Sequence, residues 1–152
     1  MSKSQSDHPG EITSIGVVGA GTMGTGIAYV AALAGCAVFV VESTPAATQK
    51  MWAALADAVE SGVKKGRITG SDSSLLVSRI SALTHIDELP ASLDIVIEPV
   101  PEDLPLKIDV LTQIERRSPK VIASNTSALS IDELGSSINE PGRFLGMHFF
   151  NP

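Results

Sequence analysis

Thirty consecutive residues near the start of the chain, from Ile12 to Val41, carry no formal charge. A run of this length is long enough for a transmembrane helix, but six glycines interrupt it. Its periodicity also changes twice: residues 15–18 are strand-like, residues 23–34 repeat apolar side chains at helical spacing, and residues 37–41 are again β-prone. The run therefore predicts a strand, a helix and a strand, with both strands buried on two faces as in a parallel sheet.

The rest of the chain repeats this alternation of strands and helices. We expect a helix capped by Thr44 that extends to about residue 66, further helices over residues 71–79 and from Asp103, and a short helix capped by Ser130. The remaining apolar segments predict strands at residues 81–84, 93–97, 121–124 and 143–149. Consecutive βαβ units with right-handed crossovers indicate an α/β fold of the Rossmann type, a doubly wound parallel sheet.

The domain organisation follows from the length and from the polar N-terminus. At 152 residues the chain has room for one ordinary domain, which we place at residues 13–152. Residues 1–12 are predicted to be a flexible arm. The first ten of them are polar and contain no apolar core of a secretory signal peptide.

Composition and charge exclude several classes of protein. A hydrophobic fraction of 43% and a charged fraction of 18% indicate a globular chain rather than a disordered one. The net charge of −6, with basic residues clustered only at residues 64–67, argues against a nucleic-acid partner. The single cysteine cannot form an intrachain disulfide, and no His/Cys cluster suits a metal. We therefore expect a cytoplasmic protein with neither a metal nor a membrane partner.

The segment Gly19-Ala20-Gly21-Thr22-Met23-Gly24 matches the pattern G-x-G-x-x-G between a predicted strand and a predicted helix. In this context Gly19 permits a tight turn, Gly21 lets the backbone approach a pyrophosphate, and Gly24 lets the helix pack close to the sheet. The N-terminus of the helix offers free N–H groups and the positive end of its dipole to phosphates. These six residues are therefore predicted to bind a dinucleotide cofactor.

Glu42 stands at the end of the next predicted strand. Dinucleotide-binding folds place an acidic residue there, which hydrogen-bonds the adenosine ribose. No Arg or Lys lies between Glu42 and Gln49 to bind a ribose 2′-phosphate, and the carboxylate would repel one. The predicted cofactor is therefore NAD rather than NADP.

Three further segments carry a resemblance to a known family: residues 97–104 (IEPVPEDL), 123–129 (ASNTSAL) and 143–152 (RFLGMHFFNP). With the glycine loop, and in this order, they resemble the NAD-binding domain of the L-3-hydroxyacyl-CoA dehydrogenase family, which includes 3-hydroxybutyryl-CoA dehydrogenases. The resemblance covers about residues 13–152. It implies NAD-dependent oxidation of an L-3-hydroxyacyl-CoA to a 3-oxoacyl-CoA in the β-oxidation of fatty acids, with an acyl-CoA as the substrate partner.

The resemblance also implies roles for single residues. His148 would be the catalytic base, and Ser127 would hydrogen-bond the 3-oxygen of the substrate. Imidazole suits the first role, because this group titrates near neutral pH. The cofactor contacts on the nicotinamide side would be Glu102, Lys107, Asn125 and Asn151.

Lys64, Lys65 and Arg67 lie at the end of the long second predicted helix. Some members of the resembled family hold the phosphates of coenzyme A there. The helix dipole would stabilise the same cations without any ligand. The residues themselves leave both interpretations open.

In the resembled family, a mostly helical domain follows the histidine motif. That domain supplies a glutamate partner for the histidine, much of the acyl-binding cleft and the dimer interface. The sequence ends at Pro152, directly after the motif. We therefore expect either part of a homodimeric dehydrogenase, with little activity by itself, or a catalytically silent NAD-binding module. A related hydroxyacid or sugar-acid dehydrogenase, as in the lambda-crystallin and gulonate dehydrogenase branch, is a further alternative.

Overall fold

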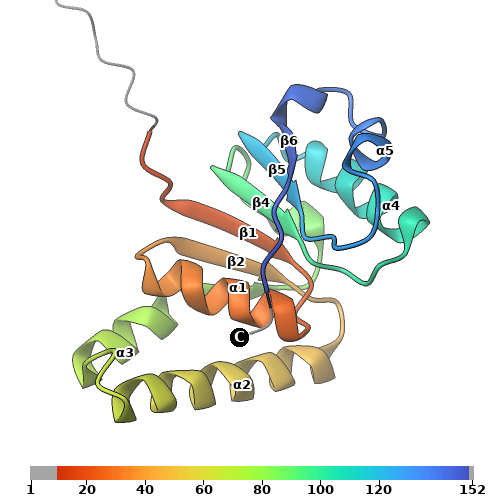
Figure 1. Ribbon diagram of the computed structural model, residues 1–152. Helices are drawn as coiled ribbons and strands as arrows, with labels where there is room; N and C mark the ends of the chain where they lie inside the picture. Colours follow the sequence, from red (N-terminus) through yellow and green to blue (C-terminus); the bar gives the residue numbers. More distant parts are fainter. Residues whose placement is uncertain (1–9, 151–152) are drawn as a thin grey trace, which may run out of the picture.

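Six parallel strands form one sheet in the computed structural model, which describes residues 10–150. The strands are β1 (Ser14–Val18), β2 (Ala37–Val41), β3 (Ile80–Leu83), β4 (Ile95–Glu98), β5 (Val121–Ser124) and β6 (Phe144–Gly146). Their order across the sheet is β3-β2-β1-β4-β5-β6 (Figure 1). This order reverses direction between β1 and β4, which confirms the predicted doubly wound sheet of the Rossmann type. Most of the predicted N-terminal arm, residues 1–9, lies outside the described part of the chain.

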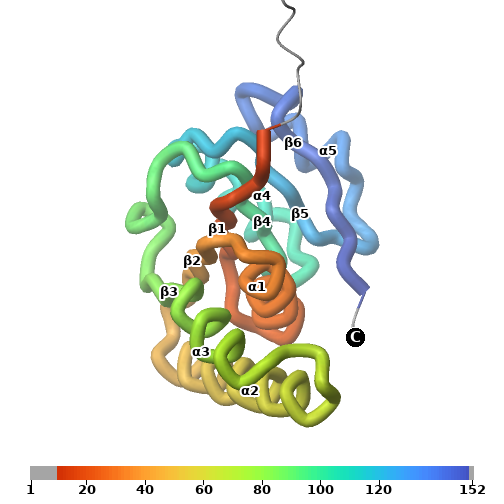
Figure 2. The backbone as a smooth tube through the Cα atoms, turned by 90° about the vertical axis from the view of Figure 1, so that its left-hand side faces the viewer, coloured from red at the N-terminus to blue at the C-terminus, as the bar shows by residue number. Residues whose placement is uncertain are grey.

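Helices cover both faces of the sheet. On one face lie α1 (Thr22–Leu33), α2 (Pro45–Lys64) and α3 (Gly70–Ser78), and on the other lie α4 (Leu104–Glu115) and the short α5 (Ile131–Gly135) (Figure 1 and Figure 2). Val17 and Val40 belong to the apolar layer under the first group, whereas Val18 and Val41 belong to the layer under the second. Neighbouring residues of a strand thus point to opposite, equally buried faces, as the uncharged run predicts.

Polar residues begin the helices largely as the sequence indicates. The side chains of Asp103 and Ser130 cap α4 and α5 by accepting backbone hydrogen bonds. Thr44 also precedes its helix, but its side chain makes no capping hydrogen bond. Thr69 and Asp72 form a reciprocal capping box, so α3 begins one residue earlier than expected. Local side-chain chemistry therefore sets most helix starts.

The last strand is shorter than predicted. A 3-10 turn occupies Pro141–Arg143, so pairing with β5 starts only after this turn. The strand itself ends at Gly146, which lies opposite Ser124, the last residue of β5. The predicted strand over residues 143–149 is thus wrong at both ends, since the turn and the neighbouring strand limit its length.

Asp94 ties together three strands at the amino-terminal edge of the sheet. Its carboxylate accepts hydrogen bonds from the backbone N–H groups of Thr13 and Ser14 at 2.9 and 3.0 Å, where β1 begins. Lys120, directly before β5, donates to the other oxygen at 2.7 Å. Hydrogen bonds from Lys120, Thr13 and Ser14 hold the pKa of Asp94 well below its usual range. Folding therefore favours the charged carboxylate.

We expect Asp94→Asn to lower the free energy of unfolding near neutral pH, by an amount that shrinks as the pH falls below about 4. A carboxylate with a lower pKa in the folded than in the unfolded chain stabilises the fold above its unfolded pKa, and this contribution disappears on protonation. Urea denaturation near neutral pH and at about pH 3 measures both effects. Asp57→Asn, at an exposed position of α2, is the control. A loss of equal size at both pH values would contradict this role of Asp94.

Candidate functional site

The glycine loop between β1 and α1 folds tightly against the helix that follows it. Gly19 has a φ of +120°, which side chains disfavour, and its N–H donates to the Val41 carbonyl of β2 at 2.9 Å. A Cβ atom on Gly24 would lie 1.9 Å from the carbonyl oxygen of Gly19. No side chain fits at that position. The structure thus contains the tight turn and the close helix packing that the glycine pattern predicts.

The N-terminus of α1 is open to a ligand. Gly21 precedes the helix without a capping side chain, and the first turn holds no acidic residue. A Cβ atom on Gly21 would have no atom within 4 Å, so the space beside the loop is free. Thr25 Oγ1 donates to the Ala20 carbonyl at 3.2 Å and fixes the loop to the helix. Free N–H groups at the positive end of a helix dipole suit a phosphate group.

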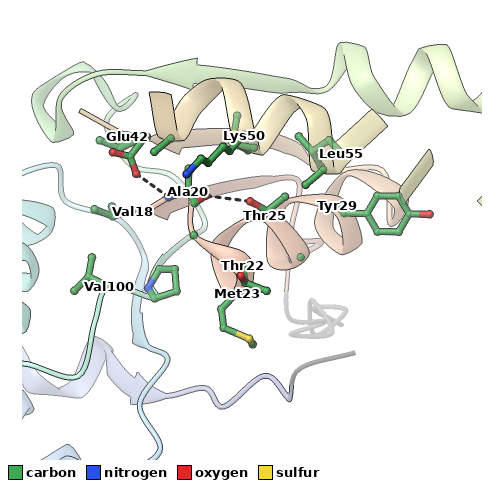
Figure 3. Close-up of a pocket in the computed structure, with 18 of the residues that line it drawn as sticks. Val18, Ala20, Thr22, Met23, Thr25, Tyr29, Glu42, Lys50, Leu55 and Val100 are labelled. Atoms are coloured by element: carbon green, nitrogen blue, oxygen red, sulfur yellow. Dashed lines mark hydrogen bonds between the residues drawn. The ribbon is translucent and has the colours of Figure 1, made fainter. Parts of the chain in front are cut away.

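Glu42 reaches the loop from the end of β2. Its Oε2 accepts a hydrogen bond from the Ala20 N–H at 3.2 Å (Figure 3). Its Oε1 accepts one from the Thr44 N–H at 2.9 Å. The carboxylate therefore lies beside the free end of α1, a position that suits hydrogen bonding to ribose hydroxyls.

A crevice of about 1390 Å³ extends along the glycine loop and between α1 and α2. Its walls include apolar side chains such as Val18, Leu55 and Val100 (Figure 3). An apolar crevice with a few polar groups is typical of a cofactor site. The predicted cofactor contacts that line it are Gly19, Ala20, Gly21, Thr22, Met23 and Glu42. Together with the open helix end, this donor and acceptor set fits a dinucleotide.

The crevice also contains residues to which no motif points. Lys50 comes from α2, Tyr29 from α1, His85 from the segment after β3 and Gln113 from α4. Figure 3 shows the Lys50 side chain extending toward the glycine loop. The lining positions 47, 50, 51, 54 and 58 of α2 recur at helical spacing. That periodicity could have indicated that Lys50 lines the crevice. His85 and Gln113 line it because the order of strands in the sheet brings their segments there, which local sequence patterns do not predict.

The lysines predicted near coenzyme A phosphates do not line this crevice. Lys64 forms an ion pair with Glu60, one turn earlier on α2, and its side chain is 73% exposed. Lys65 is also exposed, whereas Arg67 lines the crevice. Of these three cations, the structure therefore brings only Arg67 to the crevice.

Ser127 and His148 follow neighbouring strands at one edge of the sheet. β5 and β6 pair in parallel with Ser124 opposite Gly146, and the two predicted catalytic residues come shortly after this pair. The Met147 N–H continues the pairing by donating to the Ser124 carbonyl at 3.0 Å. The register thus brings both segments to the carboxyl edge of the sheet, where ligands bind in open α/β folds.

The surroundings of His148 are open. Neither His148 nor Ser127 lines the crevice, and both are exposed. The imidazole ring packs against Phe150, with ring centroids 4.6 Å apart, and Phe150 is 81% exposed. Asn151, predicted as a cofactor contact, lies outside the described residues. The histidine segment therefore presents an imidazole and an aromatic ring side by side at the surface.

Glu102 and Asn125, both predicted to contact the cofactor, connect loops in the structure. Glu102 accepts hydrogen bonds from Thr126 Oγ1 at 2.8 Å and from the Ser127 N–H at 3.1 Å, which joins the loops after β4 and β5. Asn125 Oδ1 accepts one from the Phe149 N–H at 2.8 Å, which joins the loop after β5 to the segment after β6. These two side chains therefore position the predicted catalytic segments.

Lys107 lies beneath these loops rather than on their surface. Its side chain is completely buried, and its Nζ donates to Glu98 Oε1 at 2.8 Å and to the Val100 carbonyl at 2.9 Å. Burial raises the pKa of Glu98, while hydrogen bonds from Lys107, Ser124 and Val100 oppose the shift. Lys107 is completely buried and bonded to protein groups in this structure, and its contact with the cofactor stays a prediction.

Residues 10–150 hold neither a candidate metal cluster nor a candidate membrane-spanning helix. Those residues contain no group of three or more His, Cys, Asp or Glu side chains that could hold a metal ion. No helix in the same part of the chain is long and apolar enough to cross a membrane. The polar groups with candidate functions gather instead at the carboxyl edge of the sheet.

We expect Gly24→Ala to lower the melting temperature by about 5 °C or more, because its methyl group would overlap the Gly19 carbonyl. Gly21→Ala is the matched control. It should melt close to the unmodified chain, since its Cβ atom meets no atom within 4 Å. Thermal unfolding followed by circular dichroism compares the two. Equal melting temperatures for both variants would contradict the close packing of α1 on the loop.

Residues 14–152 match the family described as 3-hydroxyacyl-CoA dehydrogenase, NAD binding domain. The probable 3-hydroxybutyryl-CoA dehydrogenase of Bacillus subtilis is 37% identical over 144 residues, which are 93% of this chain and 50% of that protein. The 3-hydroxybutyryl-CoA dehydrogenase of Clostridioides difficile is 35% identical over 140 residues, which are 91% of this chain and 50% of that protein.

Solved structures show the same relationship. The crystal structure of (S)-3-hydroxybutyryl-CoA dehydrogenase PaaH1 from Ralstonia eutropha has a TM-score of 0.87 and 42% sequence identity, covering 93% of this chain and 50% of that one. This chain thus spans about half the length of the relatives it matches. The glycine loop, Glu42 and the strand order have the arrangement of a dinucleotide-binding fold. The chain belongs to the 3-hydroxyacyl-CoA dehydrogenase family, of which it is the NAD-binding domain.

Proposed function

We propose that this chain is the NAD-binding half of an enzyme that oxidises an L-3-hydroxyacyl-CoA to a 3-oxoacyl-CoA. One observation carries the proposal: Ser127 and His148 follow β5 and β6 at the sheet edge that also holds the glycine loop. The relatives support it, since they are named as 3-hydroxybutyryl-CoA dehydrogenases, one of them as probable. The substrate would therefore be an acyl-CoA that carries a secondary alcohol.

The cofactor would cross the point between β1 and β4 where the strand order reverses. The glycine loop and the free N-terminus of α1 would hold its pyrophosphate, and Glu42 would hold its adenosine ribose. The nicotinamide half would lie on the other side, beside the loops that Glu102 and Asn125 hold. NAD supplies the acceptor for a hydride when it is bound.

Oxidation of a secondary alcohol requires loss of the hydroxyl proton while a hydride leaves the same carbon. We assign the proton to a ring nitrogen of His148, and the Ser127 hydroxyl would donate a hydrogen bond to the substrate oxygen. The backbone N–H of Ser127 donates a hydrogen bond to Glu102 at 3.1 Å, which holds the turn that carries the hydroxyl. A donor that is already fixed stabilises charge in the transition state better than one that must reorient.

The apolar surface beside His148 supports an acyl substrate. Phe150 is 81% exposed next to the imidazole, and an exposed aromatic ring there suits contact with an acyl chain or with a segment that covers it. A hydroxyacid or sugar-acid substrate would instead need polar groups for its carboxylate and hydroxyls. Assays of the natural protein with acetoacetyl-CoA and with CoA-free hydroxyacids separate these substrate classes.

We expect Glu42→Ala to weaken NADH binding by about 10- to 100-fold, as for loss of a hydrogen bond to a charged group, while NADPH binding changes little. The difference between the affinities for NADH and NADPH should therefore become smaller. Calorimetric titration of both reduced cofactors measures it. Glu60→Ala is the control, because Glu60 is exposed on α2 and outside the crevice. Unchanged NADH affinity in Glu42→Ala would remove Glu42 from the ribose site.

We expect His148→Gln in the natural protein to lower the turnover of acetoacetyl-CoA reduction by about 10² to 10⁴-fold, the usual contribution of a general acid or base. NADH affinity should stay nearly unchanged, because His148 lies outside the dinucleotide crevice. Steady-state kinetics and NADH titration test the two parts. The same change at His8, within the first ten residues, should alter neither quantity. Near-normal turnover in His148→Gln would exclude His148 as the catalytic base.

A further inference from the structure

Three polar side chains are buried together beneath the loops of the nicotinamide side, and no step of the proposed reaction uses them as reacting groups. Glu98, Lys107 and Ser124 are each completely buried. Glu98 and Ser124 are the last residues of β4 and β5 and lie opposite each other in the sheet. Lys107 reaches them from the beginning of α4. The group therefore lies at the ends of the strands that lead into the site.

The polar atoms of this group are fully paired. Glu98 Oε1 accepts hydrogen bonds from Lys107 Nζ at 2.8 Å and from the Val100 N–H at 2.6 Å, and Oε2 accepts one from Ser124 Oγ at 2.6 Å. Lys107 Nζ also donates to the carbonyl groups of Val100 at 2.9 Å and Asn125 at 3.5 Å. The group thus connects the loop after β4 to the loop after β5.

Both connected loops border the site. Val100 lines the crevice, and its Cγ1 atom would lie 3.6 Å from a Cβ atom on Gly19. Asn125 accepts a hydrogen bond from the Phe149 N–H at 2.8 Å, directly after His148. A displacement of the buried group would therefore reach both the wall of the crevice and the histidine segment.

Stability alone is a weak reason for this arrangement. A buried ion pair is often no more stabilising than apolar residues of the same size, because desolvation of both charges offsets their attraction. The other strand-end pair of the sheet, Asp94 with Lys120, lies at the opposite edge, and its lysine is 70% exposed. Glu98 and Lys107 differ from it in complete burial and in their bonds to two site loops. Those bonds constrain loop geometry.

We propose that Glu98 and Lys107 are positioning residues for the nicotinamide half of the cofactor and for His148. With Ser124 they fix the Val100 loop, and through Asn125 they fix the segment that carries the histidine. This inference rests on the proposed function, which puts the nicotinamide at these loops. Glu42 and the glycine loop, which would hold the adenosine half of the cofactor, make no hydrogen bond to this buried group in the described part of the chain.

The double variant Glu98→Leu/Lys107→Met tests the inference, because it removes both charges together and leaves no lone charge buried. Calorimetry on the purified chain compares NADH with ADP-ribose, which lacks the nicotinamide. We expect NADH affinity to fall about tenfold or more, with ADP-ribose affinity kept within about twofold. The matched control is Asp94→Asn/Lys120→Met at the opposite edge, which should leave the ratio of the two affinities unchanged.

Ser124→Ala provides a milder variant if the double variant does not fold. It removes only the hydroxyl that donates to Glu98 at 2.6 Å, and should lower NADH affinity by about two- to fivefold without affecting ADP-ribose. Amide hydrogen exchange gives a second readout. Exchange at the Phe149 N–H should become faster in either variant, whereas the Gly19 N–H, bonded to Val41 at 2.9 Å, should stay unchanged.

Equal losses of NADH and ADP-ribose affinity in a folded variant, or no loss of either, would overturn the inference. Such a result would mean that Glu98 and Lys107 have a purely structural role. An unchanged rate of amide exchange at the Phe149 N–H would overturn the inferred link between the buried group and the histidine segment. Failure of the proposed function has a different signature. The natural protein would then not reduce acetoacetyl-CoA, although the ratio of the two affinities responds to the variants as expected.

Discussion

The close approach of α1 to the turn before it determines where the cofactor site can be. A Cβ atom on Gly24 would come within 1.9 Å of the Gly19 oxygen, so only glycine lets the helix begin at this height above the sheet. The first N–H groups of α1 consequently lie at the end of β1, beside Glu42 at the end of β2. The hydrogen bond from Ala20 to Glu42 joins these two parts at 3.2 Å. The proposed phosphate site and the proposed ribose site are thus neighbours.

Stabilising residues and candidate functional residues lie at opposite edges of the parallel sheet. At the amino edge, Asp94 ties the beginnings of three strands together and does not line the crevice. At the carboxyl edge, the loops after β1, β2, β4, β5 and β6 meet, although they are far apart in the sequence. The glycine loop, proposed to bind the dinucleotide, lies at one side of the switch point, and Ser127 and His148 lie at the other. Because the strands run parallel, the glycine loop, Glu42, Ser127 and His148 all follow strand ends at this one edge.

Charge burial separates residues that position the site from residues that form it. Glu98 and Lys107 are completely buried and hold the loops from below. Glu102 and Asn125 hold the same loops from positions closer to solvent. Ser127, which this network supports, is exposed. Such a layered arrangement allows a reacting side chain to be accessible while the backbone that carries it is held in place.

The sequence alone determined the order of strands and helices, the glycine loop and Glu42, because these depend on periodicity, caps and spacing between residues close in the chain. Its later segments also identified the family through the surroundings of His148. Only the tertiary structure decided that Lys107 is buried, that Lys50 lines the crevice and that β6 is short. Each of these depends on which elements meet. Local spacing sets where an element begins and ends, whereas the order of strands in the sheet decides which side chains it buries and which it exposes.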